Sequence, residues 1–175
     1  MNIRDMFGNI SSIPFDKLPE LELYVDQVTT FLDDKLSCYK RNDNNKAITK
    51  TMINNYTKDK ILPVSNKKKY NREHLIMLII IYHLKSVLSI EDISKFNNKI
   101  NEIFPDTHDL YSNFVNMQDG LFDSVSEDID SKIKKIEDFG HSDSKEASLL
   151  YFVLYSVLEI ELKKLLVEKI IDSFC

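Results

Sequence analysis

The chain has 175 residues, a mass of 20.5 kDa and a formal net charge of −5, which suits one domain of ordinary size or two small ones. Only 3 residues are glycine and 4 are proline, where average usage gives roughly 12 and 9. The glycines lie far apart, which excludes the usual glycine-rich loops of dinucleotide enzymes and P-loop NTPases and the nucleophile elbow of α/β-hydrolases. So few turn-forming residues argue against an all-β fold, and we predict an all-α fold.

The charge is distributed unevenly along the sequence. Lys and Arg against Asp and Glu number 2 against 7 in residues 1–34, 11 against 2 in residues 35–72, 3 against 3 in residues 73–100, and 7 against 16 in residues 101–175. The segments therefore carry net charges of −5, +9, 0 and −9. A basic segment between acidic flanks indicates a local anionic partner, although a solvated lysine-rich loop has the same composition.

The cysteines and the apolar runs indicate in which cellular compartment the protein is expected. Cys38 and Cys175 are far apart and match no metal or redox spacing. The N-terminal residues lack the apolar centre of a signal peptide, and the most apolar run, Leu75–Leu84, has about half the length of a bilayer span. We therefore expect a cytoplasmic protein with reduced thiols, no membrane contact and no metal or other cofactor.

The N-terminal third is predicted to contain an arm, a helix and a loop. Residues 1–19 are mixed in composition and contain Pro14 and Pro19, which favours an extended arm. A first helix is expected to begin near Glu20, because the apolar residues after it recur at spacings of three and four. The polar, asparagine-rich segment Cys38–Lys46 is expected to be a loop.

A short basic element follows this loop. Thr49 is a suitable N-cap for a helix over Lys50–Lys60, and residues 63–70 are expected to form a basic loop or a small β-hairpin. The helical period places apolar residues on the inner side of this helix: Met52, Ile53 and Tyr56. Polar residues lie on its outer side: Lys50, Thr51, Asn54, Asn55 and Lys58.

Two further helices are predicted before residue 105. Asn71 is expected to cap a helix that runs to about Val87 and is buried on most sides, because its centre is apolar nearly all round. Ser89 and Asp92 resemble a capping box at the start of the next helix, which Pro105 ends.

The C-terminal part is also predicted to be helical. A helix that begins near Thr107 is expected to end at Gly120, and another to end at Gly140. The longest helix is expected to open at Asp143; its first half is apolar on every side and should pack inside a helical bundle, while its amphipathic second half forms an interface. The alternative is that this second half only completes the core of one chain. The residues predicted at a contact between two copies are Leu162, Leu165, Leu166 and Ile170.

No catalytic arrangement is present in the sequence. None of the four histidines belongs to a metal-binding motif, and no serine has a recognisable base or elbow. Carboxylate pairs such as Asp33–Asp34 lie at polar helix ends, where a solvated surface explains them. We therefore do not expect an enzyme.

The basic segment has the order of elements that a winged helix-turn-helix requires. A recognition helix must be short and must present small polar or amide side chains to a major groove about 12 Å wide. Asn54 and Asn55 can each pair with an adenine edge, and the lysines of a wing can contact phosphates; alternatively, both asparagines are ordinary surface residues. The predicted contacts with double-stranded DNA are Lys50, Thr51, Asn54, Asn55, Lys58, Lys67, Lys68, Lys69 and Arg72.

The run Ile48–Ile93 resembles the core of a MerR-type winged helix. In that family an aromatic-rich turn and a Gly-Leu-x-x-Pro step follow the recognition helix, and here Tyr56 and Lys60–Pro63, a step one residue shorter, stand in those places. Tyr70 and Asn71 match the residues that close the family's wing. The chain departs from the pattern because asparagines precede its aromatic residue, where the family usually has Arg, and because the family's glycine before the last helix is missing.

A closer resemblance is to the bacterial family called domain of unknown function 1836. The signature MINNY-x-K is found at Met52–Lys58, the basic run of that family at Lys68–Leu75, and its LKxVLSI segment at Leu84–Ile90. The resemblance covers about residues 24–100 and implies no activity, because that family has none established.

These patterns predict a DNA-binding transcriptional regulator that forms a homodimer. Its MerR-like winged helix-turn-helix occupies residues 20–103, and residues 104–175 form a helical region for dimerisation or sensing. The alternative is a protein–protein adaptor or inhibitor that keeps the winged-helix shape without binding DNA, and the acidic C-terminal part would suit a basic partner. Salt-dependent binding to random duplex DNA separates the two.

Overall fold

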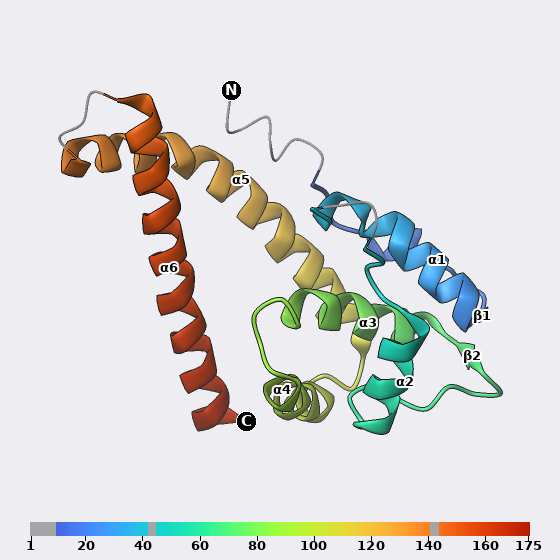
Figure 1. Ribbon diagram of the computed structural model, residues 1–175. Coiled ribbons are helices and arrows are strands. Elements are labelled where there is room, and N and C mark those ends of the chain that lie inside the picture. The colour runs from blue at the N-terminus through green and yellow to red at the C-terminus, as the bar shows by residue number, and fades with distance from the viewer. Residues whose placement is uncertain (1–9, 42–44, 141–143) are drawn as a thin grey trace.

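The computed structural model describes residues 10–41, 45–140 and 144–175. The chain is mostly helical, as predicted, with one small two-stranded sheet (Figure 1). Residues 1–9 of the predicted arm lie outside the described residues. The described part of the arm is no free tail: Ile13 and Leu18 are buried, and a short 3-10 helix over Phe15–Lys17 lies between them.

The first helix, α1, spans Val25–Lys35 and begins five residues later than predicted. The strand β1 (Leu23–Tyr24) takes the place of its expected first turn. Tyr24 is the N-cap residue, and its backbone N–H donates to Oε1 of Gln27 at 2.9 Å. The apolar residues just before Val25 therefore belong to a strand and an N-cap, and the helix begins only after them.

The second helix, α2, spans Lys50–Lys58, and its predicted cap is confirmed because the Thr49 side chain accepts from the backbone N–H of Met52 at 3.2 Å. The helix ends two residues earlier than predicted, in a Schellman motif. The N–H of Ile61 donates to the Tyr56 carbonyl at 2.8 Å, and the N–H of Lys60 donates to the Thr57 carbonyl at 3.2 Å. Lys60 supplies the left-handed residue of this motif, with φ 57°.

The basic segment before the third helix forms a tight turn and a short strand. The strand β2 (Lys69–Tyr70) pairs antiparallel with β1, so that Leu23 is opposite Tyr70 and Tyr24 is opposite Lys69. The N–H of Lys69 also donates to the Asn66 carbonyl at 2.8 Å and closes the turn. Of the loop or small hairpin expected over residues 63–70, the structure shows this turn, and the sheet partner of β2 comes from the segment before α1.

Helices α3 (Arg72–Leu84) and α4 (Ile90–Ile103) complete the N-terminal unit, which was predicted over residues 20–103. Their predicted caps are confirmed, because the side chains of Asn71 and Ser89 accept from backbone N–H groups in the first turn of each helix. The centre of α3 is buried as predicted: Leu75, Ile76, Met77, Leu78, Ile79, Ile80 and Ile81.

Helix α5 spans Thr107–Gly140 without interruption, so the break predicted at Gly120 is wrong. A Cβ atom added at Gly120 would meet nothing within 4 Å, and the exposed helix passes through this glycine at the modest cost of its low helix propensity. The hydroxyl of Tyr111, in the first turns of α5, donates to the Ile13 carbonyl at 2.7 Å. The N-terminal unit therefore extends at both ends beyond residues 20–103.

Helix α6 spans Lys145–Phe174. Its N-cap is Ser144, whose side chain accepts from the backbone N–H of Ala147, instead of the predicted Asp143, which lies outside the described residues. The expectation that its first half is enclosed in a bundle is also wrong for the single chain. Figure 1 shows α6 diverging from α5 after their joined ends, and most of its apolar side chains are exposed.

Among the described helices, none has the length and hydropathy that a bilayer span requires.

Candidate functional site

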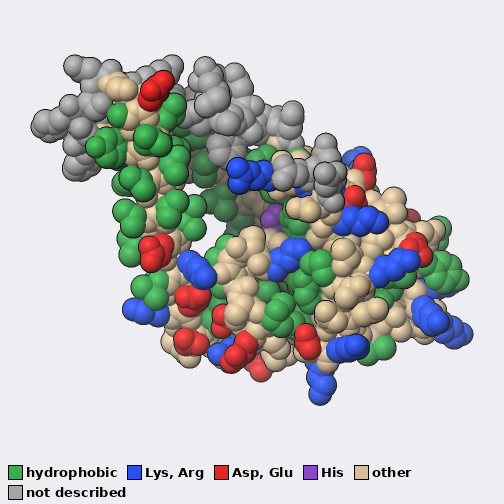
Figure 2. Space-filling model, viewed as in Figure 1, with side chains coloured by type: hydrophobic (Ala, Val, Ile, Leu, Met, Phe, Trp, Pro, Cys, Tyr) green, Lys and Arg blue, Asp and Glu red, His purple; other side chains and the backbone are tan. Residues whose placement is uncertain are grey.

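The outer face of α2 is the candidate site, and it lies as the helical period predicts. Five polar side chains are exposed on it: Lys50, Thr51, Asn54, Asn55 and Lys58. Neither Asn54 nor Asn55 is buried within the chain, so both amide groups are open to a partner. Figure 2 shows Lys and Arg side chains projecting from the end of the molecule where Figure 1 places α2 and the turn before β2.

The inner face of α2 is fixed in the core. Ile53 is fully buried, Tyr56 is 4% exposed and Met52 is half-buried. Burial raises the pKa of the Tyr56 phenol, so this side chain is neutral at physiological pH. The end of the helix is held by Asn97 of α4, whose side-chain amide donates to the Ile61 carbonyl at 2.7 Å. The outer face is therefore presented by a rigidly seated helix.

The loop before α2 is fastened by charged groups. Asp33 of α1 accepts from the backbone N–H of Ala47 at 2.9 Å and pairs with Lys40 at 2.7 Å, and these hydrogen bonds lower the pKa of its carboxyl group. Lys85 donates to the Ala47 carbonyl at 2.9 Å. These contacts fix the position from which α2 starts.

The turn over Asn66–Lys69 presents lysines in an unusual backbone conformation. Lys67 and Lys68 have φ angles of 48° and 64°, the positive values that both central residues of a type I′ turn require. Asn-Gly is the preferred pair in such a turn, and a left-handed conformation costs a residue other than glycine about 1–2 kcal/mol. Both side chains are exposed at the tip of the turn.

The turn and the start of α2 are joined through the start of α1. Lys69, at the end of the turn, pairs with Tyr24 across the sheet, and its ammonium group lies 5.7 Å from the centre of the Tyr24 ring. Two residues later, the carboxylate of Asp26 forms an ion pair with Lys50 at the start of α2. The basic turn and the N-terminus of α2 therefore border the same short segment.

Arg72 makes its contacts within the chain. Its guanidinium donates to the Leu18 carbonyl at 3.0 Å, lies 4.6 Å from the ring centre of Phe15 and approaches Glu20 at 3.7 Å. Arg72 thus fastens the N-terminal arm to α3.

Two residues of this surface were missed by the sequence analysis. Lys60 is exposed directly after α2, where its positive φ angle keeps it at the helix end. Asp26 places a negative charge next to Lys50. For Lys60 the resemblance to the MerR family offered a signal, because Lys60 stands where that family has glycine. The contact between Asp26 and Lys50 joins residues 24 positions apart, so no local pattern indicates it.

The predicted dimer contacts are all exposed in the single chain: Leu162, Leu165, Leu166 and Ile170. Among the described residues, no group of three or more His, Cys, Asp or Glu side chains is arranged to hold a metal ion.

Comparison with known families gives one match. A family model described as a domain of unknown function (DUF1836) matches residues 13–114, more than half of the chain. The chain belongs to the DUF1836 family. The matched region begins at Ile13 and ends just after Tyr111, the two residues whose hydrogen bond closes the N-terminal unit. No curated protein and no solved structure matches the chain. Helix α6 lies outside the residues that the family model matches.

Proposed function

We propose that the chain is a DNA-binding transcriptional regulator in which the DUF1836 region acts as a MerR-like winged helix. Helix α2 enters the major groove, Asn54 or Asn55 contacts a base edge, and the turn at Lys67 and Lys68 contacts phosphates. The observation that carries this proposal is the combination of a buried inner face and an exposed polar face on α2, next to a lysine turn.

The backbone strain at the turn supports a functional role for its lysines. Asn-Gly at positions 67 and 68 would form the same turn without strain, yet both positions hold lysine. Residues held in costly backbone conformations cluster at functional sites. Two ammonium groups at the tip of a turn suit phosphate contacts that are independent of base sequence.

The ends of α2 support the proposal in two further ways. The capped N-terminus of α2 carries the positive end of the helix dipole, which favours a nearby phosphate. At the C-terminal end, Lys60 has the positive φ angle that glycine adopts most easily, in the place where the MerR pattern has glycine.

A second candidate is an adaptor that binds another protein. The exposed apolar surface of α6 and the net charge of −9 over residues 101–175 favour it. An adaptor should show no salt-dependent affinity for random duplex DNA, whereas a regulator should.

Replacing Asp26 by asparagine tests the proposal without removing any predicted contact. The change frees Lys50 from its ion pair, so affinity for a random duplex should rise several-fold, and the slope of log affinity against log salt should steepen by up to about 0.9. Binding to a labelled duplex across a salt series measures both.

The matched control is Asp34→Asn, which makes the same chemical change at the other end of α1, where the carboxylate pairs with Lys35. This variant should leave affinity nearly unchanged. Absence of DNA binding by the unmodified protein, or equal gains in both variants, would contradict the proposal.

A further inference from the structure

Helix α6 turns its more polar side toward the rest of its own chain and its apolar side toward solvent. The side that faces α5 carries Ser148, Phe152, Ser156 and Glu159, at spacings of four, four and three. Glu159 accepts two hydrogen bonds from Lys132 of α5, at 2.8 and 3.0 Å, and its contacts with lysines lower its pKa to about 2. The contact within the chain therefore uses the more polar side of α6.

The opposite side of α6 is apolar and exposed. Within residues 147–158, which contain no charged side chain, the exposed positions are Leu150, Tyr151, Val153, Leu154, Tyr155, Val157 and Leu158. At 100° per residue these positions span a broad arc centred opposite the side that faces α5. Figure 2 shows hydrophobic side chains along this helix. An arrangement of this kind indicates that the main partner of α6 lies outside the chain.

The exposed area is large enough for a stable interface. Within residues 147–158, seven large apolar side chains are exposed by 44–67%. Their exposed area is on the order of 700 Å², above the roughly 300–600 Å² of the largest apolar patch on a typical monomer and near the roughly 800 Å² per partner of a standard interface.

We propose that a second copy of this chain covers the surface, with the two α6 helices packed against each other through residues 147–158 and each α5 on the outer side. The uncharged segment places no like charges opposite each other when two copies meet there. A basic partner, which the acidic C-terminal part would otherwise favour, finds no carboxylate within this segment.

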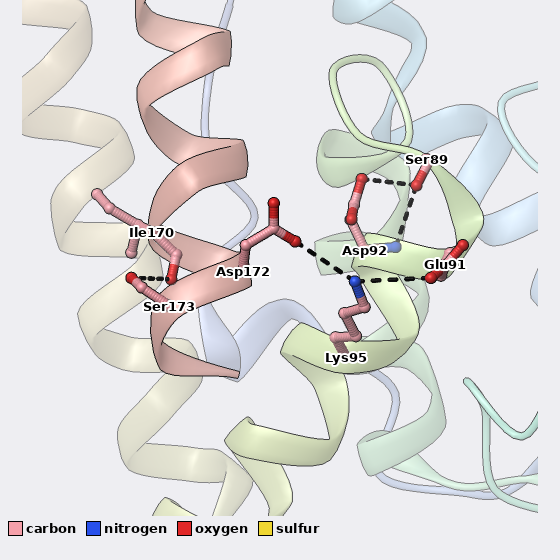
Figure 3. A network of polar contacts seen from close by, with 7 residues as sticks. All are labelled: Ser89, Glu91, Asp92, Lys95, Ile170, Asp172 and Ser173. Carbon is pink, nitrogen blue, oxygen red and sulfur yellow. Dashed lines mark hydrogen bonds and ion pairs between the residues drawn. The ribbon is translucent and has the colours of Figure 1, made fainter.

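The far end of α6 is joined to the N-terminal unit, so this contact would set the distance between two such units. Ile171 is buried, and the carboxylate of Asp172 lies 3.4 Å from the ammonium group of Lys95 on α4. Figure 3 shows this junction, in which Lys95 also approaches Glu91 of its own helix at 3.6 Å. The two α4 helices of a dimer would thus be held at a distance fixed by α6.

Sedimentation of the full chain tests the proposal, and its result does not depend on DNA binding. The unmodified protein should be a dimer at tens of micromolar. The double variant Leu154→Glu/Val157→Glu should be a monomer, with its dissociation constant raised at least 100-fold. Both side chains are exposed in the single chain, so helical content by circular dichroism should be unchanged.

Two control variants locate the contact. Leu21→Glu makes the same kind of change at an exposed position outside α6 and should remain dimeric. Leu162→Glu/Leu166→Glu lies in the second half of α6 and should weaken the dimer less than the change at 154 and 157. A monomeric unmodified protein, open-ended assembly, or a dimer that only the 162/166 variant disrupts would overturn the proposal.

Discussion

Tyr56→Ala is expected to lower the free energy of unfolding by about 3–5 kcal/mol, the range for removal of a buried aromatic ring. Tyr56 is 4% exposed on the inner face of α2, and its carbonyl accepts the hydrogen bonds that end the helix. The substitution leaves a cavity between α2 and the rest of the core. Denaturant unfolding followed by circular dichroism measures the change.

Two control variants separate the ring from its surroundings. Tyr56→Phe keeps the ring and should lose less than half as much stability. Asn55→Ala, at the exposed neighbouring position, should change the free energy of unfolding by no more than about 0.5 kcal/mol. A Tyr56→Ala variant as stable as the Asn55→Ala variant would show that α2 is not seated by this ring.

The double variant Lys67→Asn/Lys68→Gly is expected to weaken DNA binding while it stabilises the fold. Asn-Gly is the preferred pair for the observed turn, so relief of the positive φ angles should raise the free energy of unfolding by about 1–2 kcal/mol. Loss of two phosphate contacts should reduce the slope of log affinity against log salt by about 1.8, which corresponds to roughly 12-fold between 50 and 200 mM salt.

The opposite signs of the two effects make this test specific. Weaker binding caused by a damaged fold would appear with lower stability, whereas the proposal requires weaker binding in a more stable protein. Unchanged affinity and slope in a stabilised variant would remove the turn from the DNA-binding surface.

Local signals in the sequence predicted much of the fold. Thr49, Asn71 and Ser89 are helix caps because their side chains satisfy the free N–H groups of the first turn, and this chemistry needs only three or four consecutive residues. The helix break predicted at Gly120 is wrong because glycine alone does not end a helix. The periodic residues on both sides of Gly120 continue the helix through it.

Contacts between distant segments could not be predicted in this way. The guanidinium of Arg72 donates to a carbonyl 54 residues away, a contact that no local pattern in the sequence signals. The apolar first half of α6 predicted burial, and the sequence pattern does not distinguish burial within one chain from burial against another. The outer face of α2 was predicted correctly because helical periodicity and a buried aromatic residue determine it together.

The most direct test of the account is the binding of Asn54→Ala and Asn55→Ala variants to a duplex selected by the unmodified protein from a random pool, compared with binding to random DNA. Both side chains are exposed, so neither variant should lose appreciable stability. At least one variant should lose about 1–3 kcal/mol on the selected duplex and far less on random DNA, because only a base contact depends on sequence. Equal affinities of the unmodified protein and both variants for the selected duplex, or failure of the pool to yield any preferred sequence, would contradict base recognition by α2.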